Sequence, residues 1–409
     1  MSARRASLGA IFLTVFLDLL GFGLVLPFLA EQARDTFGSS DFVGTLLSSV
    51  YSLAQFVFVP IWGNVSDRVG RRPVLLWSVL ASAVGMALLG FGLSLHWGLW
   101  ALFAARIFSG IATANLGTAS AYIADVTKPE DRAKGMGLIG MAFGLGFIIG
   151  PGVGGMLAHI KVLGHEGAVP CFVAAALSVL NFGWVWFGLG ESLPQDKRGK
   201  DPRPIRPLDL VGMRQTLAAP GLGTVVMVNF ILILSFTNLD QTFRYFNKDL
   251  FGMTVRQTGF VLAFIGITAA LVQGGLIRRI AHKVDEARLI QAGTFIQSAA
   301  FAMLAASPLM GQWSLYPAGA LLALGNGLTQ PSISAFVSRR ADATKQGTTL
   351  SANQSVAALA RTMGPAFGGF LYGHLGRTAP YTVAAAGMAL ALLFALRLPM
   401  RPADTAASS

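Results

Sequence analysis

Long apolar stretches recur along the whole chain, and short polar segments separate them. Taking about 20 residues for a helix that crosses the hydrocarbon core, the pattern predicts twelve membrane-spanning helices. The first stretch runs on to Ala30 without a small-residue cleavage site, so we expect a retained helix and not a signal peptide. The expected ranges are 8–30, 43–64, 73–93, 97–124, 136–158, 168–190, 220–245, 255–277, 288–307, 313–337, 347–373 and 379–398.

Composition agrees with this pattern. The chain of 409 residues is 54% hydrophobic and only 12% charged, and its mean hydropathy is +0.61. A water-soluble core cannot hide that much apolar surface, so we expect the bilayer to be the solvent. Cys171 is the only cysteine, which excludes a disulfide framework and a thiolate metal cluster. No phosphate loop, Cys/His cluster or nucleophile with a nearby base is present, so we expect no enzyme, metal or cofactor.

The net charge of +12 would suit nucleic acid, but Lys and Arg lie in short runs between apolar stretches. If both ends are cytoplasmic, 23 of the 31 Lys and Arg residues fall in cytoplasmic segments and 6 in outer loops. The positive-inside rule therefore predicts that both termini are cytoplasmic. We expect a multi-pass protein of the cell inner membrane, monomeric and without a nucleic-acid partner.

One polar stretch divides the chain. Residues 191–219 are rich in Pro and charge and read as a cytoplasmic linker. The linker separates an N-terminal six-helix half, residues 1–190, from a C-terminal six-helix half, residues 220–409.

An internal repeat supports this division. The segment SAYIA at 120–124 matches SAFVS at 334–338, and GPGVGG at 150–155 matches GPAFGG at 364–369. Both pairs have the same offset of 214 residues. Because six spans return the chain to the same side of the membrane, the halves are expected to be parallel repeats.

The loop GNVSDRVGRRP, residues 63–73, lies between the second and third spans. We expect Gly63 to let the second span approach a neighbouring helix closely, and Gly70 to turn the loop. Asp67 lies among three arginines at a helix end, where a carboxylate can bridge to another helix. The alternative is a simple basic loop that holds this segment in the cytoplasm.

Two charges lie at comparable depth in the first half. Asp18 is about 10 residues, ~15 Å, into its span, and Arg106 is about 9 residues, ~14 Å, into the fourth span from the opposite side. Each alone would cost ~2.5 to 3.5 kcal/mol near the midplane, so we expect both to face one central cavity. Motion that separates them would favour protonation of Asp18, a means of proton coupling. A static salt bridge that docks the two spans is the alternative.

The second half also carries charges within its spans. Asp240 lies one turn before Arg244 and could form a local pair with it, or could pair with Arg361, which lies nearer the middle of its span. In the first case Arg361 either marks a site for an anionic group or bonds to amide side chains. The residues assigned to the substrate cavity are Asn115, Asp240, Arg361, Gln330 and Gln354.

The fifth span contains GFIIGPGVGG, residues 146–155. Its small residues permit tight helix contact, and its proline permits a bend. Plain helix packing is the alternative to a special role. The motif residues are Gly146, Gly150, Pro151, Gly154 and Gly155.

These motifs, in this order, resemble those of the major facilitator superfamily. The loop matches G-x-x-x-D-R-x-G-R-R, Arg106 and Gly110 match R-x-x-x-G, and the fifth span matches the antiporter pattern G-x-x-x-G-P-x-x-G-G. The resemblance implies an all-α membrane protein with 12 transmembrane helices in two six-helix parallel repeats. It also implies that the loop is part of an inner gate, with Asp125 as expected partner. The inner-gate residues are Gly63, Asp67, Arg68, Gly70, Arg71, Arg72 and Asp125.

Within the superfamily, the chain looks like the drug/proton antiporter branch, and the stretch around Asp18 is similar to that of tetracycline/proton antiporters. Those antiporters also carry acidic residues in spans 3 and 9, whereas 77–93 and 289–307 contain none here. The resemblance implies alternating access, with protons entering through Asp18 as Arg106 assists, and export of an amphipathic small molecule.

Two alternatives remain open for the function. One is a lipid or lysolipid exporter of the same fold, and the other is a non-transporting membrane sensor. The expected partners are therefore a small amphipathic substrate or a lipid, with the surrounding membrane lipids.

Overall fold

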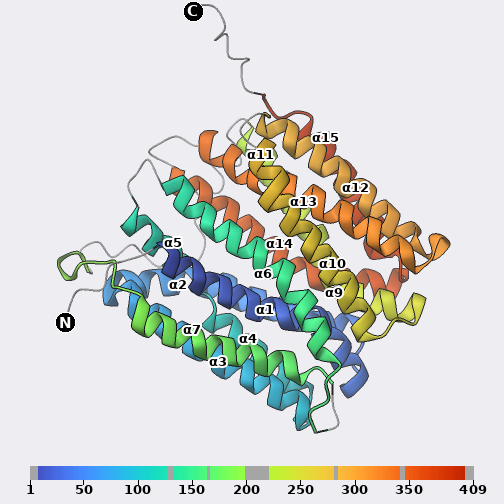
Figure 1. The fold of residues 1–409 in the computed structure, drawn as a ribbon, viewed down its shortest axis with the longest axis horizontal. Helices are drawn as coiled ribbons and strands as arrows, with labels where there is room; N and C mark the ends of the chain where they lie inside the picture. Colours follow the sequence, from blue (N-terminus) through green and yellow to red (C-terminus); the bar gives the residue numbers. More distant parts are fainter. Residues whose placement is uncertain are drawn as a thin grey trace, which may run out of the picture.

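The computed structural model describes residues 8–127, 132–163, 166–198, 221–280, 284–340 and 346–400. These residues form helices and turns and contain no β-strand. Long helices lie side by side in one bundle (Figure 1). The all-helical fold class is confirmed.

Each of the twelve expected ranges falls on helical structure in the described part of the chain. The first six correspond to α1 (Leu8–Phe37), α2 (Asp41–Val69), α3 (Arg71–Ser94), α4 (Leu99–Ala112) with α5 (Leu116–Val126), α6 (Arg132–Ala158) and α7 (Ala168–Gly188). The last six correspond to α9 (Leu222–Phe251), α10 (Val255–Leu271), α12 (Glu286–Met310), α13 (Leu315–Arg340), α14 (Gln346–Leu375) and α15 (Ala379–Ala395). After α10 the helix continues as a π-helical turn (Val272–Ile277) and α11 (Arg278–Ile280).

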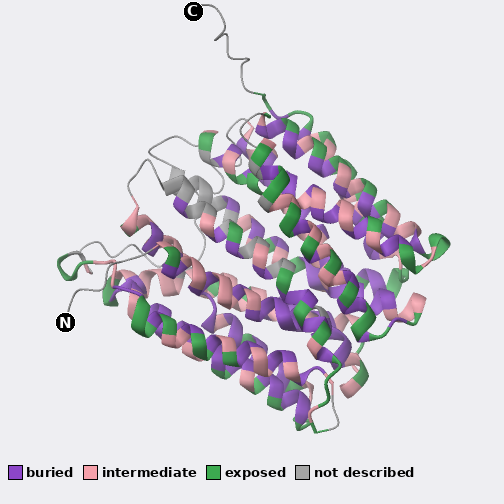
Figure 2. Cartoon of the chain, viewed as in Figure 1, coloured by how far each residue is buried: buried purple, intermediate pink, exposed green. Residues whose placement is uncertain are grey.

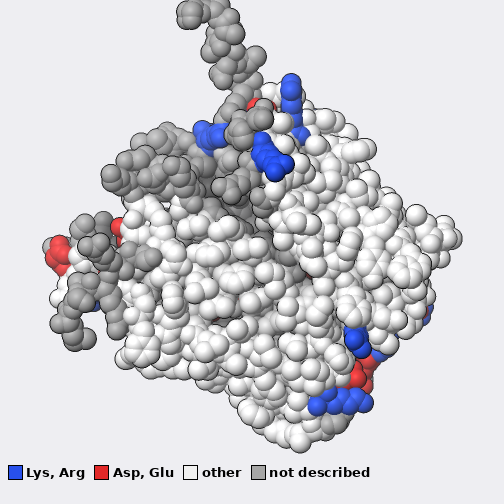
Figure 3. All heavy atoms as spheres, viewed as in Figure 1, with Lys and Arg blue, Asp and Glu red and all other residues white. Residues whose placement is uncertain are grey.

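The exposed side chains agree with a position in a membrane. Within the described residues, 8 helices are long and apolar enough to cross a membrane. Large apolar side chains are exposed on these helices, among them Trp77 at 68%, Trp100 at 73% and Phe187 at 70%. Exposed positions occur along the length of the helices (Figure 2). On the face in view, charged side chains gather near the ends of the bundle and leave a broad uncharged belt between (Figure 3). Lipid is the solvent that suits this belt.

The fourth span is not the single helix that hydropathy predicts. It breaks at Thr113 to Asn115, between α4 and α5. Side chains of α2 bond to the carbonyls at the break: Trp62 donates to the Ile111 carbonyl at 2.8 Å, and Gln55 donates to the Thr113 carbonyl at 3.1 Å. The break is therefore tolerated inside the bundle because its backbone groups are satisfied.

Packing joins early and late parts of the chain. Helix α1 packs against α6 and α7, α6 packs against α10, and α2 packs against α14. Small residues make the α1–α6 contact very close: a Cβ added at Gly150 would lie 2.7 Å from the Cα of Gly23. These contacts set the position of Asp18 on α1.

Only the start of the expected linker lies in the described part. Residues 191–198 include a short 3₁₀ turn (Gln195–Lys197), and residues 199–219 lie outside the described residues. The division into two six-helix halves stays a prediction.

Candidate transport site

Asp18 lies on α1 between two buried asparagines. Its Oδ2 accepts a hydrogen bond from Asn115 Nδ2 at 2.8 Å, and its Oδ1 accepts one from Asn181 Nδ2 at 3.2 Å. Asn181 also donates to the Thr14 carbonyl at 3.0 Å. The break in the fourth span brings Asn115 to this carboxylate. Asn181, on α7, is a site residue that sequence reasoning missed, since a single asparagine in an apolar span carries little signal.

Arg106 is fully buried on α4. Its Nε donates to the Leu47 carbonyl at 3.2 Å, and its guanidinium lies over the rings of Tyr51 and Phe22, at 4.2 Å and 5.4 Å from their centroids. Neither terminal nitrogen has a hydrogen-bond partner within the described residues. Among those residues Asp18 and Arg106 form no ion pair, so the static salt bridge between them is wrong.

Tyr51 connects these charges to the C-terminal part of the chain. Its hydroxyl is 2.6 Å from Thr113 Oγ1, at the break of the fourth span. It lies close enough to Arg106, Asp18 and Arg361 to interact electrostatically with all three. Arg361 belongs to α14, so α1, α2, α4 and α14 converge on one polar site.

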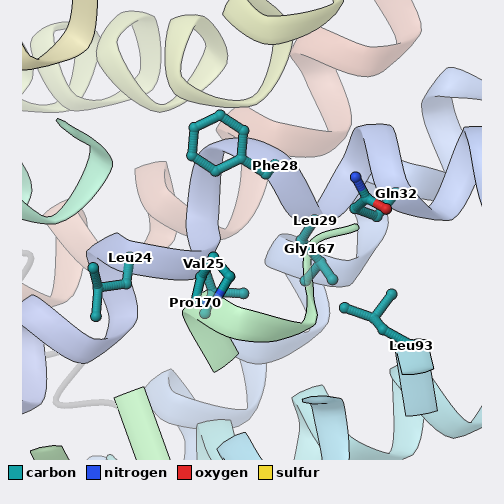
Figure 4. A pocket seen from close by; sticks show the side chains of 8 residues that line it. All are labelled: Leu24, Val25, Phe28, Leu29, Gln32, Leu93, Gly167 and Pro170. Atoms are coloured by element: carbon teal, nitrogen blue, oxygen red, sulfur yellow. The ribbon is translucent and has the colours of Figure 1, made fainter. Parts of the chain in front are cut away.

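The hollow shown in Figure 4 is a different place. It lies between α1, α3 and α7, and Gln32 is the only side chain in its lining that ends in a polar group. Its lining residues are Leu24, Val25, Phe28, Leu29, Gln32, Leu93, Gly167 and Pro170. It is not the cavity expected around Asp18 and Arg106.

Asp240 does not pair with Arg244, which is one of the two partners that the sequence leaves open for it. Arg244 Nε lies 2.6 Å from Glu31 Oε2, an ion pair that is not aligned as a hydrogen bond, and Arg244 also donates to the Met253 carbonyl at 2.8 Å. Glu31 is 2% exposed, so a buried carboxylate outcompetes the neighbour one turn away. Asp240 forms no ion pair within the described residues, neither with Arg244 nor with Arg361, and its buried Oδ2 has no hydrogen-bond partner there.

The assignment of Gln330 and Gln354 to the substrate cavity stays a prediction. The carbonyl of Gln330 accepts a hydrogen bond from Ser334 Oγ at 3.2 Å. The side chain of Gln354 lies outside the described residues.

A charge network joins α1 and α2 to α9. Arg34 Nη1 lies 3.1 Å from Asp41 Oδ1 and 3.1 Å from Asp249 Oδ2. Arg34 Nη2 donates a second hydrogen bond to Asp249, to Oδ1 at 3.2 Å. Lys248 pairs with Asp35 and lies 3.4 Å from Glu31. Partners on α1 and α9 are up to 215 residues apart in sequence, so no local pattern indicates the network. We define it by Glu31, Arg34, Asp35, Asp41, Arg244, Lys248 and Asp249.

Arg71 is the centre of the loop expected to form an inner gate. It pairs with Asp67, lies 3.3 Å from Asp125 Oδ2, and donates to Ser66 Oγ at 2.7 Å. Arg68 is exposed. Helix α3 begins at Arg71, and the carboxylate of Glu191 accepts its backbone N–H at 2.9 Å.

The remaining loop residues, Arg72, Gly70 and Gly63, differ in their surroundings. Arg72 donates to the Trp186 carbonyl at 2.7 Å. Gly70 has φ +110°, which agrees with the predicted turn. The close approach expected at Gly63 is wrong: a Cβ there would meet nothing within 4 Å among the described residues.

The glycines of the fifth span face two helices. A Cβ at Gly146 would lie 2.8 Å from Leu19 Cβ, and Gly150 and Gly154 also press on α1. Gly155 instead faces α10, where a Cβ would lie close to Gly259. Pro151 lies inside α6. The motif therefore places α6 between α1 and α10.

Comparison with known proteins identifies the class of protein. The model of the Major Facilitator Superfamily matches residues 11–365, and the chain belongs to this family. It is 34% identical to the tetracycline resistance protein, class C, of Escherichia coli over 356 residues, 86% of each chain.

Two solved structures share the fold. The human organic anion transporter MFSD10 (TETRAN) matches with a TM-score of 0.73 at 25% identity, over 95% of this chain and 98% of that one. A bacterial homologue of the human lysosomal transporter Spinster matches with a TM-score of 0.68 at 16% identity, over 95% and 94%. The chain is thus a multi-pass membrane transporter of this family.

Proposed function

We propose that the protein is a proton-coupled exporter of an amphipathic small molecule. The observation that carries the proposal is the surrounding of Asp18, which holds two amide donors and no cation within the described residues. A charged carboxylate at that depth costs ~2.5 to 3.5 kcal/mol, so a proton is its natural neutralising partner. Asn115 and Asn181 hold the carboxyl group in either protonation state.

The relatives support a small organic substrate. One is named for tetracycline resistance, and the human structural neighbour is an organic anion transporter. Neither name fixes the substrate of this chain. In this proposal the protein lies in the cell inner membrane with both termini in the cytoplasm, as the Lys and Arg distribution predicts.

Alternating access is the proposed mechanism. The charge network ties the first two helices to α9 and would keep the outer side closed, whereas Arg71 with Asp67 and Asp125 would close the inner side. The two six-helix halves would rock about the site around Tyr51, so that one side opens as the other closes. Glycine contacts of α6 with α1 and α10 would carry this motion.

The test is substrate-dependent proton flux in everted membrane vesicles, with tetracycline, ethidium and a lysophospholipid as probes. Asp18→Asn should abolish flux at normal expression, and the matched control Asp196→Asn, in the linker turn, should keep it. Full proton-driven transport by Asp18→Asn would refute the coupling role. Flux with the lysophospholipid alone would favour the lipid exporter, and no flux with any probe would favour the sensor.

A further inference from the structure

We propose that Arg106, with Tyr51 and Arg361, binds an anionic group of the transported molecule, such as a carboxylate. This inference rests on the proposed function and narrows its substrate class to amphipathic organic anions.

The orientation of Arg106 is the first argument. Its Nε donates to the Leu47 carbonyl at 3.2 Å, and its central carbon, Cζ, lies over the Tyr51 ring, 4.2 Å from the centroid. These contacts hold the guanidinium at one nitrogen and beside one ring, and they leave the edge that carries the two terminal nitrogens without a hydrogen-bond partner among the described residues. Two parallel N–H groups on this edge match the two oxygens of a carboxylate.

The balance of charge around Tyr51 is the second argument. Tyr51 interacts with Arg106 and Arg361 and with the single carboxylate of Asp18. Asp18 already receives two hydrogen bonds, from Asn115 and Asn181, which hold it away from Arg106. Both oxygens of Asp18 are therefore occupied, whereas the terminal nitrogens of Arg106 have no hydrogen-bond partner among the described residues. An anion is therefore the complementary ligand.

The aromatic surroundings supply the amphipathic part. Phe22 stacks on Tyr51 with ring centroids 4.6 Å apart, and both rings lie beside the guanidinium. An aromatic or aliphatic body bound next to them would keep the carboxylate dehydrated, which strengthens its bond to Arg106. Arg106 is fully buried in this conformation, so the anion enters when the halves separate.

The binding test uses three probes with the same aromatic body: 4-(1-pyrenyl)butyrate, its neutral butanamide, and the corresponding primary ammonium. Purified full-length protein in detergent is titrated with each, and pyrene fluorescence is read without a proton gradient. We expect the carboxylate to bind at least about tenfold more tightly than the other two, a difference of about 1.4 kcal/mol. Equal binding of all three, or preference for the ammonium, would overturn the proposal.

Variants assign the site. Arg106→Lys keeps the charge but loses the two-pronged edge, and Arg361→Gln removes the second cation, so each should weaken carboxylate binding about tenfold. Arg256→Gln is the matched control, because Arg256 also lies over an aromatic ring, that of Phe260 at 5.5 Å, but is exposed and remote from the site. Thermal melting checks that each variant is folded. The comparison of the three probes uses the unmodified protein, so it does not depend on the folding of a variant.

Carboxylate binding that neither Arg106→Lys nor Arg361→Gln weakens would place the anion elsewhere and refute the assignment. The proposed function is tested separately, because it requires proton flux and this assay does not. Export of cationic or neutral amphiphiles with normal proton flux would leave the exporter standing and reject the anion site. Selective carboxylate binding without proton flux would do the reverse.

Discussion

Arg71 and Arg68 show how differently two arginines of one loop are placed. Both lie in a basic run that the sequence presents as uniform. Arg71 is 6% exposed and reaches Asp67, Asp125 and Ser66, whereas Arg68 points to the outside. Burial and shared partners therefore assign the bridging role to one residue.

Arg71→Gln should lower stability by about 1–3 kcal/mol, because two partly buried carboxylates lose their shared cation. The transport rate should fall with it, since Asp125 at the end of α5 is no longer tied to the loop. Thermal unfolding in detergent and vesicle transport measure both effects. Arg68→Gln is the control and should behave like the unmodified protein. Equal losses in both variants would mean that general loop charge is what matters.

Asp18 and Arg106 show what sequence reasoning at this scale can reach. Hydropathy and helix rise place both at membrane depth, and Asn115 is predicted for the same site. The actual partners are decided by backbone geometry: the break at Thr113 to Asn115 turns Asn115 toward Asp18, and Arg106 turns to Leu47 and Tyr51. The directions in which these side chains point cannot be predicted from the pattern of residue types.

At the scale of elements, helix positions follow well from hydropathy, and interruptions do not. The fourth span reads as one apolar run, yet it breaks where Gln55 and Trp62 of α2 can bond to its carbonyls. Partners on another helix make the break possible, so it is invisible within the span itself. The same limit explains why Gly63 is open while Gly154 is tightly packed.

Gly154→Ala should destabilise the protein by about 1–3 kcal/mol through overpacking. A Cβ there would lie 2.8 Å from the Leu24 carbonyl carbon, and the backbone of α1 cannot move aside as a flexible side chain can. Gly183→Ala, on α7, would meet nothing within 4 Å among the described residues and is the control. Melting temperatures compare the two. Unchanged melting of Gly154→Ala would show that the α1–α6 contact is loose.

At the scale of the whole molecule, the charge network is the feature that could not be predicted from the sequence. The residues Arg34, Arg244 and Lys248 count as outer charges in the topology prediction, and their partners are far away along the chain. Hydropathy, the repeat and the family motifs predict the bundle and its class. Which charged residues join its distant parts depends on the three-dimensional fold.

Asp249→Arg should open the bundle at the charge network, because it replaces an attraction to Arg34 with a repulsion. The reporter is Ser48→Cys in a Cys171→Ser background, since Ser48 is 2% exposed and bonded to Gln241 at 2.8 Å across the α2–α9 contact. The new cysteine should react about tenfold faster with a charged methanethiosulfonate. This change corresponds to a loss of about 1.4 kcal/mol from the free energy that favours the closed state. Combining Arg34→Asp with Asp249→Arg should slow labelling again. Unchanged labelling in the single variant would show that the network does not hold this side closed.

The same network has a consequence for biosynthesis. Lys248 follows Asp35 by 213 residues, so at roughly 5–20 residues per second the ribosome needs about 10–40 seconds to deliver the cations of α9 after the acids of α1. During that interval α9 is not yet present to pair with the acidic residues Glu31, Asp35 and Asp41. The newly inserted first helices therefore expose these carboxylates at one end. Final locking of the bundle must therefore wait for α9, which makes this helix a late checkpoint in assembly.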